Sequence, residues 1–146
     1  MLLKSMMAGL AVAVIAAGTA TAAECTLPPE AQAGKTVSNL CKSCHVFEAD
    51  KPSRPTGPNL HDVYGRKAGT RTDFTKYSEG MQGASAAGVV WTDDKISEYV
   101  ADPKAFLVKV NGKEVKHAMI YQLKDEQKRK DVIAFLKAIK DKPECN

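Results

Sequence analysis

The sequence predicts an all-α domain in which a few short helices are joined by long loops. Three segments repeat apolar side chains at the spacing of a helix that buries one face. The stretch from Val46 to Val90 is rich in Gly, Pro, Ser and Thr, a composition typical of loops. The chain has 146 residues, the length of one domain, and its 44% of hydrophobic residues is ordinary for a globular protein. A formal net charge of +4 is too small to indicate a nucleic-acid-binding protein.

Residues 1–23 are typical of a secretory signal peptide. Lys4 precedes an apolar run from Met6 to Ala17, and small residues follow as far as Ala23. The apolar run is too short to span a bilayer comfortably, although an uncleaved membrane anchor is the alternative. We therefore expect a signal peptide at 1–23 and one exported, periplasmic domain at 24–146.

The first predicted helix leads to Cys41. Pro28 and Pro29 stand ahead of it, where a helix tolerates proline. The apolar face that the spacing predicts consists of Ala33, Val37, Leu40 and Cys41.

A second helix is predicted to begin at Thr92, whose hydroxyl can cap the first turn, and to end before Pro103. Its apolar stripe consists of Ile96, Tyr99 and Val100. The last helix is predicted from about Asp125 to Lys140. Its apolar positions are Val132, Phe135, Leu136 and Ile139.

The motif Cys41-Lys42-Ser43-Cys44-His45 indicates a covalently bound haem. C-x-x-C-H is the attachment signature of a c-type haem. Two cysteines at this spacing lie on one side of a helical turn, so both sulfurs can reach the vinyl groups of one porphyrin, and the imidazole of His45 can bind its iron. A redox-active C-x-x-C would follow a strand pattern, and a zinc site would need further ligands with local spacing. A haem also accounts for the long loop, because a loop can wrap a large apolar disc.

From Gly34 to Ile139 the sequence resembles the class I cytochromes c, of the mitochondrial cytochrome c and bacterial cytochrome c2 type. Besides the haem motif, the matching text is Thr56-Gly57-Pro58-Asn59-Leu60-His61, Tyr64-Gly65-Arg66-Lys67-Ala68-Gly69, Trp91, Ile96-Ser97-Glu98-Tyr99-Val100, Asp102-Pro103-Lys104 and Asp131-Val132-Ile133-Ala134-Phe135-Leu136. The resemblance implies an all-α class I cytochrome c fold, with helices and long loops around one haem c attached through Cys41 and Cys44.

The resemblance also implies roles for the residues around the haem. His45 would bind the iron, and the carbonyl of Pro58 would hold its other ring nitrogen. Three side chains that can donate to a carboxylate would hold a haem propionate: Arg66, Tyr77 and Trp91. Tyr99 would lie near the sixth iron ligand.

Met119 is the predicted sixth ligand of the iron. It lies between Trp91 and the last helix, where the resembled family keeps its ligand methionine. Met81 and His117 are the alternatives. The sequence departs from the mitochondrial type in two longer loops, one before Trp91 and one before Met119, and the familiar text around the methionine is absent.

A histidine and a methionine on the iron leave no axial position for oxygen or a substrate. We therefore expect a soluble exported electron carrier, and not an enzyme, that transfers single electrons between redox-partner proteins. Two alternatives are a haem subunit of a periplasmic oxidoreductase complex and a haem enzyme or sensor with a labile sixth site.

Lysines near the expected haem edge predict a surface that steers the protein towards acidic docking faces of its partners. They are Lys42, Lys67, Lys104, Lys109, Lys113 and Lys116. Ordinary solvation of these lysines is the alternative. We expect a monomer that binds no nucleic acid and is not stably inserted in a membrane after signal cleavage.

The fold analogy implies a pairing for the two remaining cysteines, Cys25 and Cys145. In the resembled fold the first and last helices cross, so the chain ends can approach each other, and an exported protein folds in an oxidising compartment. We predict a Cys25–Cys145 disulfide, with two free thiols or an intermolecular bridge as the alternatives.

Overall fold

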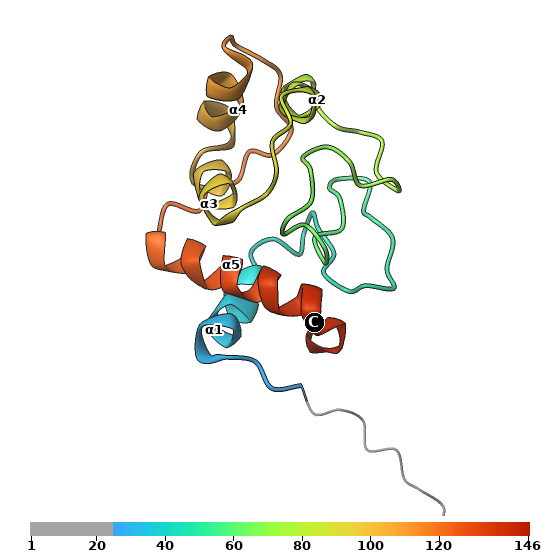
Figure 1. Cartoon of the computed structure of the whole chain (residues 1–146), viewed down its shortest axis with the longest axis vertical. Coiled ribbons are helices and arrows are strands. Elements are labelled where there is room, and N and C mark those ends of the chain that lie inside the picture. Colours follow the sequence, from blue (N-terminus) through green and yellow to red (C-terminus); the bar gives the residue numbers. More distant parts are fainter. Residues whose placement is uncertain (1–24) are drawn as a thin grey trace, which may run out of the picture.

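The computed structural model describes residues 25–146, so the predicted signal peptide at 1–23 lies outside the described residues. Within the described part, the chain forms helices joined by loops, and no β-strand (Figure 1). The helices are α1 (Pro29–Ser38), α2 (Glu79–Ala86), α3 (Asp93–Ala101), α4 (Pro103–Asn111), α5 (Glu126–Asp141) and the short 3-10 helix η1 (Pro143–Cys145). The all-α prediction is confirmed.

Helices α1 and α5 form the main packing unit of the fold, and α3 and α4 lie on the other side of α5 (Figure 1). The two helices approach closely at Gly34, where a Cβ atom would lie 1.9 Å from the carbonyl oxygen of Asp131. The buried residues of α1 are Ala31, Gly34 and Ser38. The predicted apolar face was therefore wrong at Ala33, which is exposed. Leu40 and Cys41 follow the helix and line the cavity described below. Close contact between two backbones selects small side chains over large apolar ones.

Helix α5 follows its predicted pattern. The carboxylate of Asp125 accepts a hydrogen bond of 3.0 Å from the backbone N–H of Lys128, which caps the first turn. Its buried positions are Val132, Ile133, Phe135, Leu136 and Ile139. These side chains provide the central wall of the core.

Helix α3 also begins where the sequence predicts, after the Thr92 cap. It ends before Pro103, but a further helix follows directly. Asp102 accepts a hydrogen bond of 3.0 Å from the N–H of Ala105 and so caps a further helix, α4. Proline is tolerated at the first position of a helix, because the N–H it lacks would have no partner there. Gly112, at φ 68°, ends α4 in the left-handed conformation.

Helix α2 lies within the segment that was predicted to be a loop, and that prediction was wrong for Glu79–Ala86. Ser78 caps its first turn. The side-chain amide of Asn111 on α4 donates to the carbonyl of Gly80 at 3.1 Å, and its oxygen occupies the space beside Gly83. Contacts with α4 thus hold a glycine-rich helix whose local propensity is low.

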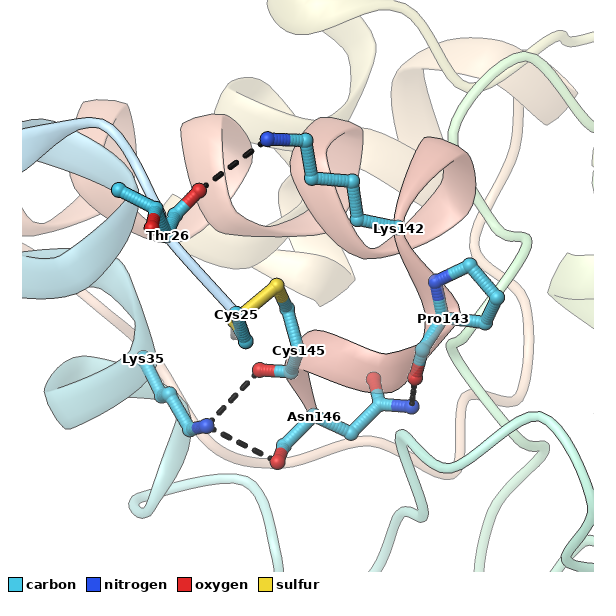
Figure 2. Close-up of a disulfide and its surroundings, with 7 residues drawn as sticks. All are labelled: Cys25, Thr26, Lys35, Lys142, Pro143, Cys145 and Asn146. Carbon is cyan, nitrogen blue, oxygen red and sulfur yellow. Dashed lines mark hydrogen bonds between the residues drawn. A yellow bond between two sulfur atoms is a disulfide. The ribbon is translucent and has the colours of Figure 1, made fainter. Parts of the chain in front are cut away.

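The two ends of the described chain are tied together, as Figure 2 shows. Cys25 and Cys145 form a disulfide, which confirms the predicted pairing. The ammonium of Lys35 on α1 donates to the carbonyl oxygens of Cys145 and Asn146, at 2.8 and 2.9 Å. Lys142 donates to the carbonyl of Thr26 at 3.2 Å. This clamp fixes both ends of the described part of the chain to the α1–α5 unit.

Candidate functional site

A cavity of about 450 Å³ lies between the helices and the long loops. All the residues predicted to bind the haem line it: Cys41, Cys44, His45, Pro58, Arg66, Tyr77, Trp91, Tyr99 and Met119. Met81 lines the same cavity, whereas His61 and His117 do not. The fold thus brings residues as distant in the sequence as Cys41 and Met119 to one cavity.

The two cysteines come from turns that continue beyond α1. Cys41 N–H donates to the carbonyl of Ser38 at 2.9 Å, and Cys44 N–H donates to the carbonyl of Cys41 at 3.1 Å. Both thiols are free. Burial raises the pKa of the Cys41 thiol, and the neighbouring Cys44 adds to this shift. The turn therefore presents both sulfurs to one cavity, and the Cys41 thiol keeps its proton more readily than an exposed one.

The ring of His45 is held in one orientation and one tautomer. Its Nδ1 lies 2.8 Å from the carbonyl oxygen of Pro58, and only a protonated Nδ1 can donate there. Burial lowers the pKa of His45, although the bond to Pro58 opposes the shift, so the neutral ring is favoured. In that neutral tautomer Nε2 carries a lone pair.

Gly57 allows the loop to pass directly beside this imidazole. A Cβ at residue 57 would lie 2.6 Å from Cε1 and 2.8 Å from Nδ1 of His45. Thr56 next to it donates from its hydroxyl to the carbonyl of Cys44 at 3.1 Å. The loop is thus fastened to the cysteine turn on one side and to the histidine on the other.

Arg66 and Tyr77 form a polar end of the cavity, where the backbone of Arg66 pairs with that of Trp91. Gly65 N–H donates to the carbonyl of Trp91 at 2.8 Å, and Trp91 N–H donates to the carbonyl of Arg66 at 3.0 Å. The guanidinium of Arg66 donates to the Asp62 carboxylate and to the carbonyl of Asn59. Burial raises the pKa of the Tyr77 phenol, which therefore keeps its proton.

Aromatic rings form an apolar wall of the cavity. Trp91 packs against Tyr99 and Phe106, with ring centroids 5.1 and 5.9 Å apart. Tyr99 meets Phe106 edge to face at 5.5 Å. Burial raises the pKa of the Tyr99 phenol strongly, so its hydroxyl is a donor at any physiological pH.

Met119 lies on the segment between α4 and α5, which is held at both ends. Gly80 N–H of α2 donates to the carbonyl of Lys116 at 2.9 Å, and Leu123 N–H donates to the carbonyl of Val100 of α3 at 2.7 Å. Met81 comes from α2 itself and is buried. Two thioethers therefore reach the cavity from different elements.

These donors fit a c-type haem. The cavity offers two free thiols, an imidazole with a fixed tautomer and a thioether, which are the attachment and axial groups of such a haem. It also offers a guanidinium, a phenol and an indole N–H, from Arg66, Tyr77 and Trp91, for a carboxylate of a porphyrin.

Sequence reasoning missed the residue that organises the loop around His45. Asn59 is fully buried, and its amide donates to the carbonyls of Glu48 and Lys51 at 2.8 and 2.7 Å. Its side-chain oxygen accepts from the N–H of His61 at 2.8 Å. The signal that could have identified Asn59 is its position as a polar residue between Pro58 and Leu60. Asp62 and Arg71, which join Arg66, carried no such signal.

The chain is similar over most of its length to bacterial cytochromes c2. It is 38% identical over 136 residues to cytochrome c2 of Cereibacter sphaeroides, a match that covers 85% of this chain and 94% of the relative. It is 43% identical over 118 residues to cytochrome c2 of Rhodopseudomonas palustris, covering 76% and 81%. No protein-family model matches the chain.

Solved structures agree in fold. The structure of cytochrome c2 from Rhodobacter sphaeroides matches with a TM-score of 0.68 and 38% identity, over 73% of this chain and 92% of the other. That from Paracoccus denitrificans matches with a TM-score of 0.69 and 36% identity, over 77% and 97%. Among residues 25–146 no helix has the length and apolar character needed to cross a membrane.

Proposed function

Because the chain belongs to the class I cytochromes c, with cytochromes c2 among its relatives, we propose that it is an exported one-electron carrier with His45 and Met119 as the axial ligands of its haem iron. Membership of this family makes the protein an electron carrier with a covalently bound c-type haem. The observation that carries the proposed ligand pair is that the imidazole of the C-x-x-C-H motif and the thioether of Met119 line the same cavity.

Cys41 and Cys44 are the proposed points of attachment. Both thiols are free, both line the cavity, and both come from one continuous set of turns after α1. Two covalent links through such a turn hold the next residue, His45, close to the bound group. When bound, the haem supplies the one-electron couple of the carrier.

The Pro58 carbonyl is the proposed positioning group for His45. By accepting a hydrogen bond from Nδ1–H it favours the tautomer in which Nε2 carries the lone pair that a metal needs, and it restrains rotation of the ring. Gly57 contributes by leaving room for the imidazole. Fixed ligands favour fast electron transfer, because little has to move when the charge changes.

We assign the haem carboxylate to the polar end of the cavity. Arg66, Tyr77 and Trp91 all line the cavity, and the backbone pairing of Arg66 with Trp91 keeps these two residues adjacent. Tyr99, on the aromatic wall, is the proposed neighbour of the sixth ligand, since its protonated hydroxyl can donate to a sulfur.

A carrier fits these ligands better than an enzyme. With an imidazole and a thioether on the iron, no axial position is left for a substrate, so the protein is proposed not to be an enzyme. The comparisons do not favour the two alternatives, a haem subunit of an oxidoreductase complex and a haem enzyme or sensor with a labile sixth site.

The purified holoprotein provides the test. We expect a reversible one-electron couple, a sulfur-to-iron absorption band in the oxidised form, and no carbon monoxide binding by the reduced form at neutral pH. Ready carbon monoxide binding would mean an open or labile sixth site and would overturn the His45–Met119 pair.

The proposed location is the periplasm, and the proposed partners are redox proteins with acidic faces. Three of the six edge lysines are already paired with carboxylates of this chain: Lys104 with Glu114, Lys109 with Glu98 and Lys113 with Glu79. Lys42, Lys67 and Lys116 have no such pair within residues 25–146. These three are the better candidates for steering.

A further inference from the structure

A four-residue charge cluster borders the polar end of the cavity. The Asp62 carboxylate pairs with the guanidinium of Arg66 and, at 3.0 Å, with that of Arg71. Arg71 also pairs with Asp73 at 2.7 Å. Arg66 lines the cavity, whereas Asp62 does not. Asp62 therefore lies behind the arginine that it holds, outside the lining of the cavity.

We propose that Asp62 is a positioning residue that lowers the reduction potential of the carrier by holding Arg66 and offsetting its charge. This inference rests on the proposed function, because it requires that the cavity binds the redox group. It adds to that function a residue outside the cavity that sets how readily the carrier accepts an electron.

The sign follows from electrostatics. Reduction transfers one electron from a one-electron donor protein to the site, whose charge falls by one unit. A nearby cation stabilises that change and a nearby anion opposes it. The two guanidiniums and two carboxylates of the cluster sum to zero, so the loss of Asp62 alone makes the cluster one unit more positive beside the cavity.

The two arginines of the cluster are sheltered, whereas the Asp62 carboxylate that joins them is partly open to solvent. The side chains of Arg66 and Arg71 are 15% and 21% exposed and that of Asp62 is 44% exposed, so solvent screens the two guanidiniums less than the surface lysines. Partial burial opposes ionisation of Asp62, but Arg66 and Arg71 outweigh it and keep the pKa of this carboxyl below its usual range. Asp62 is therefore charged at neutral pH.

Three variants of the holoprotein distinguish an electrostatic effect on the reduction potential from a structural one. Asp62→Asn removes the negative charge and retains an oxygen that can accept from both arginines. Arg71→Gln removes a positive charge from the other side of Asp62. Glu126→Gln is the matched control: it removes the same charge as Asp62→Asn, from an exposed carboxylate that pairs with Lys130 at 2.6 Å and does not line the cavity.

The midpoint potential of each variant is measured by mediator titration at low ionic strength, with thermal unfolding recorded alongside. We expect Asp62→Asn to raise the potential and Arg71→Gln to lower it. Each change should alter the equilibrium constant for exchange with a fixed mediator at least threefold, about 28 mV for one electron. Glu126→Gln should stay close to the unmodified protein.

Two outcomes would overturn the inference. One is a shift of the midpoint potential in the same direction in Asp62→Asn and Arg71→Gln, because a loosened loop would move the potential without regard to the sign of the lost charge. The other is a shift in Asp62→Asn no larger than that in Glu126→Gln. Should Asp62→Asn fail to fold, the direction of the Arg71→Gln shift decides alone. Absence of a reversible one-electron couple in the unmodified protein would instead refute the proposed function.

Discussion

At the scale of single residues, the surroundings of His45 decide what its ring can do. The carbonyl of Pro58 accepts a hydrogen bond from Nδ1–H and Gly57 provides the space, while burial favours the neutral form. The haem motif predicts a histidine ligand, but the hydrogen bond and the close approach of Gly57 determine its tautomer and orientation.

The choice between the two methionines of the cavity is testable by substitution. Met119→Ala should give a folded haem protein that lacks the sulfur-to-iron band, has a lower potential and binds carbon monoxide when reduced, because a thioether favours the ferrous state. Met81→Ala is the matched control, since Met81 lines the same cavity from α2. If the band survives in Met119→Ala and disappears in Met81→Ala, the two assignments must be exchanged.

Gly57→Ala should displace the imidazole of His45. Its Cβ would lie 2.6 Å from Cε1, so either the ring or the loop must move. We expect a loss of about 1–3 kcal/mol in the free energy of unfolding, typical of overpacking, together with a changed haem spectrum. Gly34→Ala is the control, because it overpacks the α1–α5 contact away from His45. A spectrum unchanged in Gly57→Ala would show that the loop yields and the ring does not.

At the scale of elements, close backbone contact and helix caps explain where the fold differs from the predicted pattern. Helix α1 buries small residues because α5 approaches it at Gly34. Helix α4 forms because Asp102 both ends α3 and caps the next turn, which Pro103 can begin. Helix α2 depends on Asn111 of α4, a contact between segments 31 residues apart.

The α1–α5 contact gives a prediction of its own. In Gly34→Ala the Cβ would lie 1.9 Å from the carbonyl oxygen of Asp131, a backbone atom that cannot move without its helix. We expect the free energy of unfolding to fall by about 3 kcal/mol, at the upper end of overpacking effects. Chemical denaturation of the holoprotein measures it. A fall below about 0.5 kcal/mol would mean that the two helices separate freely.

At the scale of the whole molecule, the covalent links and the charge distribution set stability and recognition. The disulfide closes a loop with a sequence separation of 120, and Lys35 and Lys142 strengthen the same clamp (Figure 2). The six lysines that could steer a partner are spread over loops and α4, and three of them are paired within the chain.

Removal of the disulfide should destabilise the protein without altering its redox site. The chain-entropy model allows up to about 4–5 kcal/mol for a loop of this length, and a covalent haem that already restricts the unfolded chain should bring the loss to about 2–4 kcal/mol. The double variant Cys25→Ala, Cys145→Ala is compared with the unmodified protein by chemical denaturation. Its midpoint potential should stay the same. A large shift in that potential would show that the clamp reaches the haem site.

Reversal of the unpaired edge lysines should slow electron transfer to an acidic partner. Lys42→Glu and Lys116→Glu together are expected to lower the rate several-fold at low salt and to have little effect at high salt, because screening shortens the reach of exposed charges to about 8–10 Å. Lys130→Glu, on α5 and away from the haem cavity, is the control. Equal slowing at every salt concentration would argue against steering.

The sequence by itself determined the redox chemistry and the helical class, because a haem motif and helical periodicity are local patterns. Every residue that the sequence predicts around the haem lines the cavity, because these residues belong to ordered segments such as Gly57-Pro58-Asn59-Leu60. Only the tertiary structure decided which face of α1 is buried, that α2 and α4 are helices, and that Asp62 joins Arg66 to Arg71. The physical reason is that these features depend on contacts between distant segments, such as Asn111 with Gly80 or Gly34 with Asp131, which no local spacing records.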